Sequence, residues 1–561
     1  MRWLFSAVYS EIRGLHQSAY ILGAFSFGSQ ILALVRDRLF AHYFGASSDL
    51  DVYYAAFKVP DLLFVLFASV LSVYVLIPFV SEKTENGNVR GAQHMLSNVF
   101  SAFLIGYVVA AVGIGIFAGS LTSFLFPGFD TSQQVLLVTL LRILLLQPFL
   151  LGISSLFGVI TQLGQRFVLY ALSPLLYNAG IIFGVVVLYP TWGMLGVVWG
   201  VLLGALLHLL IQLPLVQQSD LRPRLLLRIN TRELGRILAN SLPRALTLSL
   251  NQIVLLAYVG IASAMAKGSV SIFQFAFNLQ SVPLAIIGVS YSVAAFPILA
   301  QLYSKGHHME YVERVETTLR HLVFWIIPIT GFTIVLRSQI VRVILGSGAF
   351  NWDATRLTAA ALALFSLSLA AQSVNLLIVR AFYAGGNTKI PFAVTVLSTV
   401  GTLCISLGLY SAFISFPSFA FTVEQFLRVT GIQGAEIIML PLGYSIGQIL
   451  HTFVLLFIFM RKYKVPYRQL THTCARSLVA MCVGGVISYG VLNLVVSGIN
   501  TEKFMGILLH GAVAGAAGLS GVIWLLYILK SPELQELWGA LRKRPLFARI
   551  FGPEKVDTLA L

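Results

Sequence analysis

Charged residues are scarce in this sequence. They make up only 10% of its 561 residues, whereas 58% of the residues are hydrophobic and the mean hydropathy is +0.87. A soluble domain carries roughly 25% charged residues. A soluble fold of this length would therefore leave far too much apolar surface in water. The shortage of charge excludes a soluble enzyme and favours a chain that uses lipid as its solvent.

Cysteines and catalytic motifs are also lacking. Cys404, Cys474 and Cys482 are scattered along the chain, which predicts neither a disulfide framework nor a metal site. There is no Walker A loop, no Gly-x-Ser-x-Gly elbow and no His-Glu-x-x-His motif. We expect no catalytic residues, no metal and no organic cofactor. Any work on a substrate must then draw on an ion gradient, the membrane potential or the gradient of the substrate itself.

Long apolar runs are what the sequence has instead. A helix needs about 20 apolar residues to cross a bilayer, and runs of this length recur along the whole chain. The strands of an outer-membrane barrel would be short and alternating. We therefore predict an all-α polytopic membrane protein with about 14 transmembrane helices, near residues 20–43, 55–80, 95–119, 134–161, 168–189, 193–216, 240–265, 270–300, 319–337, 355–383, 390–413, 437–460, 474–496 and 506–529.

The positive charge follows the topology. The net charge is +16, and basic residues gather in the links after the sixth and twelfth predicted spans and in the tail. The alternate links 44–54, 120–131 and 189–193 hold no Lys or Arg. The positive-inside rule then puts both termini on the cytoplasmic side of an inner membrane. Nucleic-acid binding is disfavoured, because the charge is spread over loops rather than concentrated in a domain.

An internal repeat divides the chain at an offset of about 220 residues. Ser29-Gln30-Ile31 is echoed by Asn251-Gln252-Ile253, and Ala56-Phe57-Lys58 by Ala276-Phe277-Asn278. Two halves of six helices enter the membrane in the same orientation, which predicts two parallel lobes, followed by two extra C-terminal helices. The predicted parts are an N-terminal amphipathic segment (1–18), an N-lobe (19–218), a basic cytoplasmic linker (219–239), a C-lobe (240–461), the extra helices (462–530) and a basic cytoplasmic tail (531–561).

Polar residues inside the predicted spans are the candidate site. Ionisable groups in a membrane are costly, so they usually face a cavity or a partner. Arg36 and Asp37 in the first span are candidates for holding an anionic headgroup, although the pair could simply neutralise itself. Asp51 and Arg142 are further candidates, with interface placement or snorkelling as the alternative. Uncharged candidates, which together suggest a hydrated interior, are Ser29, Gln30, Asn178 and Asn278.

The sequence around these residues resembles a known family. The run RDRLFAHYFGASSDLDVYYAAFKVPDLL at 36–63 is similar to the start of the MurJ (MviN) lipid II flippases, and so are LFPGFD at 125–130 and RAFYAGGNTKIP at 380–391. The resemblance covers nearly the whole chain. It implies the fold of the multidrug/oligosaccharidyl-lipid/polysaccharide exporter superfamily, with the two extra helices forming a groove for a lipid tail.

The resemblance also implies a substrate and its site. The substrate would be lipid II, an undecaprenyl-diphosphate-linked disaccharide pentapeptide, moved to the outer leaflet by alternating access. Membrane lipids and cell-wall synthesis proteins would be its other partners. Arg36, Asp37 and Asp51 match the family motif, whereas Gln30, Phe64 and Asn278 stand where well-studied members carry arginine. A flippase for another polyprenyl-diphosphate-linked oligosaccharide and a cation-coupled exporter of the same superfamily therefore stay open as alternatives.

Overall fold

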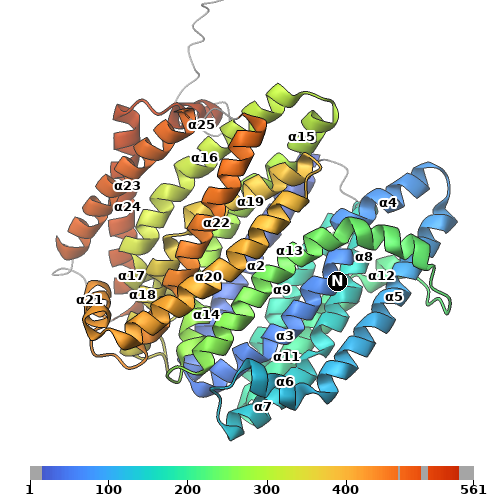
Figure 1. Ribbon diagram of the computed structural model, residues 1–561, viewed down its shortest axis with the longest axis horizontal. Coiled ribbons are helices and arrows are strands. Elements are labelled where there is room, and N and C mark those ends of the chain that lie inside the picture. The colour runs from blue at the N-terminus through green and yellow to red at the C-terminus, as the bar shows by residue number, and fades with distance from the viewer. Residues whose placement is uncertain (1–14, 72, 465–467, 495–502, 543–561) are drawn as a thin grey trace, which may run out of the picture. The chain divides into compact units, whose positions relative to one another are not determined.

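The computed structural model describes residues 15–71, 73–464, 468–494 and 503–542. All regular structure in these ranges is helical and none of it is strand, which confirms the predicted fold class (Figure 1). Most of the predicted amphipathic segment at 1–18, and of the predicted basic tail at 531–561, lies outside the described residues.

The first part of the chain runs through the six spans predicted for the N-lobe. Its helices are α2 (Leu15–Phe44), α3 (Ser48–Val70), α4 (Val73–Glu85), α5 (Val89–Ile116), α6 (Ala118–Leu125), α7 (Thr131–Leu144), α8 (Leu146–Leu163), α9 (Phe167–Phe183), η1 (Gly184–Leu188, a π-helix), α10 (Tyr189–Trp192), α11 (Met194–Leu210) and α12 (Leu213–Gln218). The second predicted span, 55–80, was wrong in its bounds, because α3 ends at Val70 and α4 begins at Val73.

The rest of the chain continues in the same way. Its helices are α13 (Thr231–Ser263), α14 (Ser269–Pro283), η2 (Leu284–Val289, a π-helix), α15 (Ser290–Ser304), α16 (His308–Val335), α17 (Arg337–Ile344), α18 (Trp352–Ser366), α19 (Leu369–Ala384), α20 (Lys389–Ser415), α21 (Pro417–Leu427), η3 (Ala435–Ile438, a 3-10 helix), α22 (Met439–Tyr463), α23 (Arg468–Leu494), α24 (Phe504–Ile528) and α25 (Pro532–Arg542).

Many of these helices can cross a membrane. Among the described residues, 11 helical stretches are long and apolar enough, and a twelfth is added if α18 and α19, bent by 44°, form one span. Helices α2 and α3 are 30 and 23 residues long, and they contain the first predicted span and most of the second, but they are not among these stretches. The chain is a multi-pass membrane protein, and the count of 14 spans stays a prediction.

The described chain forms two compact units that are discontinuous in sequence. One comprises Met1–Leu279, Ile344–Ala361 and Thr388–Gly447, and the other Gln280–Val343, Leu362–Asn387 and Gln448–Leu561. The predicted N-lobe, 19–218, lies wholly within the first unit, whereas the predicted C-lobe, 240–461, is divided between the two. The lobe boundaries therefore stay predictions.

In the first unit, glycines let α9 and α11 approach each other closely (Figure 1). Gly180 of α9 and Gly184, the first residue of η1, face Gly196, Gly200 and Gly204 of α11, all at four-residue spacing, which keeps each set on one face. A Cβ atom at Gly180 would overlap the Cα atom of Gly204, and one at Gly200 would overlap that of Gly184. Small residues at this spacing bring membrane helices into backbone contact. The crossing of α9 and α11 is therefore a tightly packed part of this unit.

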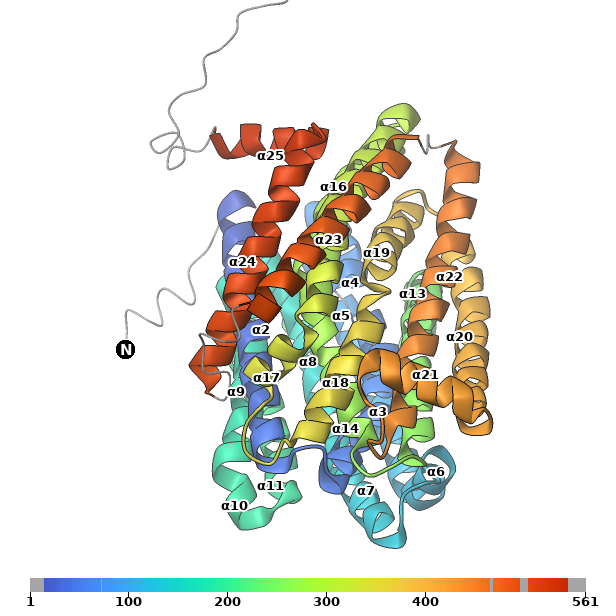
Figure 2. The same ribbon diagram turned by 90° about the vertical axis from the view of Figure 1, so that its left-hand side faces the viewer.

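In the second unit, α25 is fastened to the helices beside it. Figure 2 shows α25 running across the ends of α23 and α24. The carboxylate of Glu533 is only 1% exposed and accepts hydrogen bonds from the hydroxyls of Thr473 (2.7 Å) and Ser531 (2.8 Å). Arg320 of α16 lies 3.9 Å from the same carboxylate. These contacts satisfy the buried charge and hold α25 against α16 and α23.

Candidate functional site

The candidate site is built around Arg36, on the C-terminal half of α2, a helix that packs against α9. Its Nε and Nη2 atoms donate to Oδ1 of Asp37 at 3.0 and 2.8 Å, and its Nη1 atom donates to Oδ1 of Asn178 at 3.4 Å. Asp37 is buried, so its charge needs this cation. The two anchors hold the guanidinium in place.

A chain of hydrogen bonds leads from Asp37 to a second cation. Nδ2 of Asn278 donates to Oδ2 of Asp37 at 3.0 Å, and Nε2 of Gln274 donates to Oδ1 of Asn278 at 2.8 Å. Nζ of Lys58 then donates to Oε1 of Gln274 at 2.8 Å. The chain ties α2, α14 and α3 together and links Arg36 to Lys58 through uncharged amides.

These residues surround a small hollow, which we call the charged hollow. Its volume is about 230 Å³, and it is lined by Arg36, Phe40, Tyr53, Tyr54, Phe57, Lys58, Asp61, Tyr177, Ile181, Gln274 and Asn278. A guanidinium has five N–H donors and an ammonium three. Three donors of Arg36 and one of Lys58 have partners among the described residues. The remaining donors are available to an anion.

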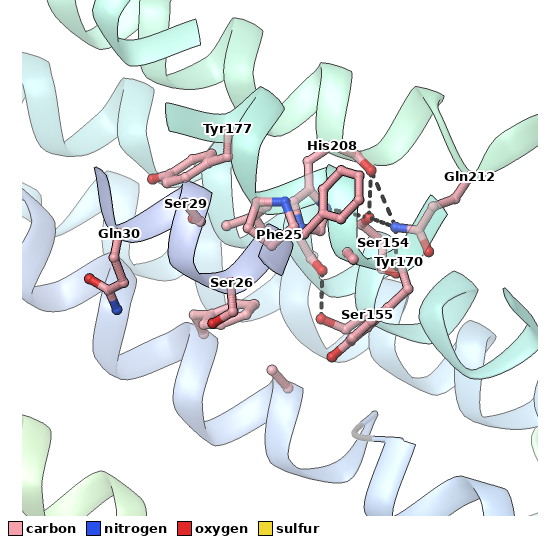
Figure 3. Close-up of a pocket in the computed structure, with 15 residues that line it drawn as sticks. Phe25, Ser26, Ser29, Gln30, Ser154, Ser155, Tyr170, Tyr177, His208 and Gln212 are labelled. Atoms are coloured by element: carbon pink, nitrogen blue, oxygen red, sulfur yellow. Dashed lines mark hydrogen bonds between the residues drawn. The ribbon is translucent and has the colours of Figure 1, made fainter. Parts of the chain in front are cut away.

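A larger hollow, which we call the polar chamber, adjoins the charged hollow at Tyr177. Its volume is about 540 Å³, and it is lined by Phe25, Ser26, Ser29, Gln30, Phe64, Ala68, Leu151, Ser154, Ser155, Tyr170, Ala171, Pro174, Tyr177, His208 and Gln212 (Figure 3). Nδ2 of Asn178 donates to Oγ of Ser29 at 3.3 Å, so one amide touches both Arg36 and the chamber wall. Two candidates from the sequence, Ser29 and Gln30, therefore line this chamber.

Three side chains of the chamber form a network between α8 and α11. Oγ of Ser154 lies 2.7 Å from Nδ1 of His208, and Nε2 of Gln212 donates to the same Oγ at 2.6 Å (Figure 3). Ser154 and Gln212 are each 1% exposed. Buried polar groups are rarely left without a partner, and this network satisfies them while it fixes one wall of the chamber.

Asp51 lies outside both hollows. Its Oδ1 atom accepts from the backbone N–H (2.7 Å) and the hydroxyl (2.6 Å) of Ser271, and its Oδ2 atom accepts from the backbone N–H of Gly268 (2.7 Å). The first N–H groups of a helix lack partners within the helix, and a carboxylate there also interacts favourably with the helix dipole. Asp51 therefore joins the start of α3 to the start of α14.

Arg142 also lies outside both hollows. It is exposed on α7, and its Nε atom donates to the backbone oxygen of Gly115 at 3.0 Å. The structure thus brings Arg36, Asp37, Asn178, Asn278, Ser29 and Gln30 together, and leaves Asp51 and Arg142 apart from them.

The sequence analysis did not select three polar residues of the charged hollow. Lys58 and Asp61 lie on the same face of α3 as Tyr54, at spacings of three and four residues, which a helical reading could have found. Gln274 precedes Asn278 by one helical turn and faces the same hollow. Their partners come from other helices, so spacing alone could not have assembled the hollow.

Most of the chain is similar to known proteins. The family model described as "Lipid II flippase MurJ" matches residues 40–509. "Probable lipid II flippase MurJ" of Buchnera aphidicola subsp. Acyrthosiphon pisum is 30% identical over 367 residues, which cover 65% of this chain and 72% of that protein. "Lipid II flippase MurJ" of Burkholderia cenocepacia is 24% identical over 527 residues, which cover 91% of this chain and 97% of that protein.

Solved structures share the fold. An inward closed conformation of the lipid II flippase MurJ aligns with a TM-score of 0.70 at 22% identity and covers 91% of this chain and 99% of its own. An inward-facing multidrug resistance MATE family transporter of the MOP superfamily aligns with a TM-score of 0.62 at 16% identity and covers 78% of this chain and 94% of its own. At these identities, the two likenesses establish the fold alone.

Proposed function

The chain belongs to the lipid II flippase MurJ family, and on that premise we propose that it carries lipid II from the cytoplasmic to the outer leaflet of the bacterial cytoplasmic membrane. The protein would act as a transporter rather than a catalyst. The obstacle is the diphosphate, because a charge in the hydrocarbon costs at least several kcal/mol. The lipid tail can stay in the bilayer throughout, so only the headgroup needs a polar path.

The observation that carries this proposal is the partly buried, anchored guanidinium of Arg36. Asp37 and Asn178 occupy three of its N–H groups and leave two for a phosphate. A guanidinium binds phosphate through parallel, charge-assisted hydrogen bonds. Lys58 offers a second cation in the same hollow. Arg36 is thus the group that we propose binds the diphosphate, and Asp37 and Asn178 position it.

The charge balance of the hollow suggests how transport is driven. The formal charges of Arg36 and Lys58 are cancelled by those of Asp37 and Asp61. A bound diphosphate would make the loaded hollow negative, whereas the empty hollow would stay neutral. A negative inside potential favours outward movement of an anion by about 2.3 kcal/mol per charge per 100 mV. We propose that the membrane potential drives the loaded step and leaves the return step unopposed; a coupling ion is not required.

Alternating access needs a closure that opens at the outer side. We place the Asp51 end of α3 there, because the link 44–54 contains no Lys or Arg. The contacts from Asp51 to Ser271 and Gly268 join two segments from different halves of the sequence repeat. Breaking these contacts would separate the starts of α3 and α14 and open the outer side to the headgroup.

A second candidate is a flippase for another undecaprenyl-diphosphate-linked oligosaccharide. Arg36 and Lys58 would recognise the diphosphate, which such lipids share. Gln30, Phe64 and Asn278 supply none of the arginines expected at their positions, which favours this alternative. A cation-coupled exporter is less well supported, because the carboxylate of Asp37 is already paired with Arg36 and Asn278.

Exposure of lipid II at the cell surface tests the proposal. In cells where this protein is the only flippase and can be depleted, an added enzyme that cleaves the lipid II headgroup reports outer-leaflet lipid II. We expect cleavage to fall on depletion and to return with the wild type or Arg142→Met, but not with Arg36→Met/Asp37→Asn. If cleavage is unchanged after the protein is gone, lipid II is the wrong substrate and the second candidate takes its place.

A further inference from the structure

The polar chamber holds hydrogen-bonding groups that the charged hollow does not use. Among the described residues, the side chain of Gln30 has no hydrogen-bond partner, and neither does Nε2 of His208. Figure 3 shows Gln30 apart from the network of Ser154, His208 and Gln212, so polar groups face the chamber from more than one side. A volume of about 540 Å³ lies within the usual range of ligand pockets, about 300–1,000 Å³.

The chemistry of the lining selects a kind of ligand. Of the described residues that line the chamber, none is Asp, Glu, Lys or Arg. The lining combines hydroxyl, amide and imidazole groups with the rings of Phe25, Phe64, Tyr170 and Tyr177. A pyranose ring offers hydroxyls at its edge and C–H groups on its faces, and both match this lining. A charged peptide would find no counter-ion here, and a lipid tail would leave the polar groups unsatisfied.

The two hollows are arranged for a sugar that carries a diphosphate. Tyr177 lines both hollows, and Asn178 hydrogen-bonds Arg36 through its oxygen and Ser29 through its nitrogen. A diphosphate at Arg36 would therefore point its attached group toward the chamber. We infer that the polar chamber binds the sugar ring next to the diphosphate of the transported lipid. This inference rests on the proposed function and adds a subsite for an uncharged sugar to it.

A purely structural role for the chamber predicts something different. The Ser154 network ties α8 to α11, so its loss could weaken the fold rather than the binding of a sugar. Gln30 separates the two explanations, because its amide makes no hydrogen bond to the described protein. Gln30→Met keeps the length of the side chain and removes only the groups that could reach a ligand. A structural role gives no reason for this variant to bind less.

Binding to the purified full-length protein in nanodiscs tests the inference. The two probes are undecaprenyl diphosphate and undecaprenyl-diphosphate-N-acetylglucosamine, which differ by one sugar and contain no peptide. We expect the wild type to bind the sugar-bearing probe more tightly. Gln30→Met should weaken that binding by about 2- to 10-fold, the value of one hydrogen bond, and leave the bare diphosphate unaffected. Gln218→Met, an exposed change at the end of α12, is the matched control.

The outcomes separate the subsite from the function. If the wild type binds both probes equally, or if Gln30→Met binds the sugar-bearing probe as the wild type does, the chamber is not a sugar subsite and the flippase proposal stands. If the wild type binds neither probe, the proposed function falls and the subsite falls with it.

Discussion

Replacing Arg36 by methionine removes the cation that we propose binds the substrate, but it also leaves a buried anion behind. Asp37 would keep the hydrogen bond from Asn278 and lose both of those from Arg36. Breaking a buried ion pair from one side costs about 3–5 kcal/mol. The Arg36 side chain is 21% exposed, so we expect the lower end of this range. A loss of transport in the single variant could therefore reflect either lost substrate binding or a loss of folded protein.

The second substitution, Asp37→Asn, resolves this confusion. The amide of asparagine has the size of the carboxylate, can still accept the hydrogen bond from Asn278, and carries no charge. Replacing both members of a buried ion pair by neutral groups is often neutral for stability. We expect the free energy of unfolding of Arg36→Met/Asp37→Asn to lie within about 1 kcal/mol of the wild-type value. Its transport should stay lost, because two charge-assisted hydrogen bonds to phosphate, each about 1.5–3 kcal/mol, correspond to at least a 100-fold loss of binding.

Two measurements complete this test. Thermal unfolding of the purified variants in detergent gives their stability, and binding of undecaprenyl diphosphate gives their affinity for the phosphate. The expected pattern is a destabilised single variant and a stable double variant, neither of which binds. A double variant that binds and transports as the wild type does would refute the role of Arg36. A double variant as unstable as the single one would refute the ion-pair explanation.

Three further variants test other parts of the fold by thermal unfolding. Asp51→Asn loses at least one charge-assisted hydrogen bond at the start of α14 and should lower the free energy of unfolding by about 2 kcal/mol, whereas Asp49→Asn, at an exposed position, should change it little; equal effects would contradict the role of the contacts from Asp51 to Ser271 and Gly268. Gly200→Ala should lower the free energy of unfolding by about 1–3 kcal/mol, because its methyl group would overlap backbone atoms of Gly180 and Gly184. Gly113→Ala, with open space around it, should not lower it. Burial disfavours the carboxylate of Glu533, but its hydrogen bonds outweigh burial and lower its pKa below the ordinary 4.5. The stabilisation from this carboxylate is fully present above that pKa and is lost as the pH falls below it. Acidification from about pH 5 to about pH 3 should therefore destabilise the wild type more than Glu533→Gln. Parallel curves of stability against pH for the two proteins would contradict this.

Much of the fold could be predicted because hydropathy reports which segments prefer lipid. The first predicted span, 20–43, lies within α2, and the spans at 390–413 and 506–529 agree closely with α20 and α24. Hydropathy does not report where a helix ends in water. Helix α16 begins at His308, well before the predicted start at residue 319. The prediction missed its first turns because they are polar although they are helical.

The candidate site was predictable only in part. Arg36 and Asp37 stood out because charges inside a span need a partner, and the family resemblance that they carried is confirmed. The hydrogen bonds between Asp37 and Asn278 and between Asp51 and Ser271 each join residues more than 200 positions apart. Such pairs depend on how helices are placed against each other, which the spacing of residues within one helix does not contain.

The glycine crossing of α9 and α11 has a consequence for how the hollows change shape. The two backbones lie so close at Gly180, Gly184, Gly200 and Gly204 that even one added methyl group would overlap the facing backbone, which leaves little room for either helix to move toward the other. Tyr177 and Asn178 on α9, and His208 on α11, therefore move as a single piece. Within this unit, adjustment to a bound headgroup would then come from α2, α3 and α14, which close against this fixed wall.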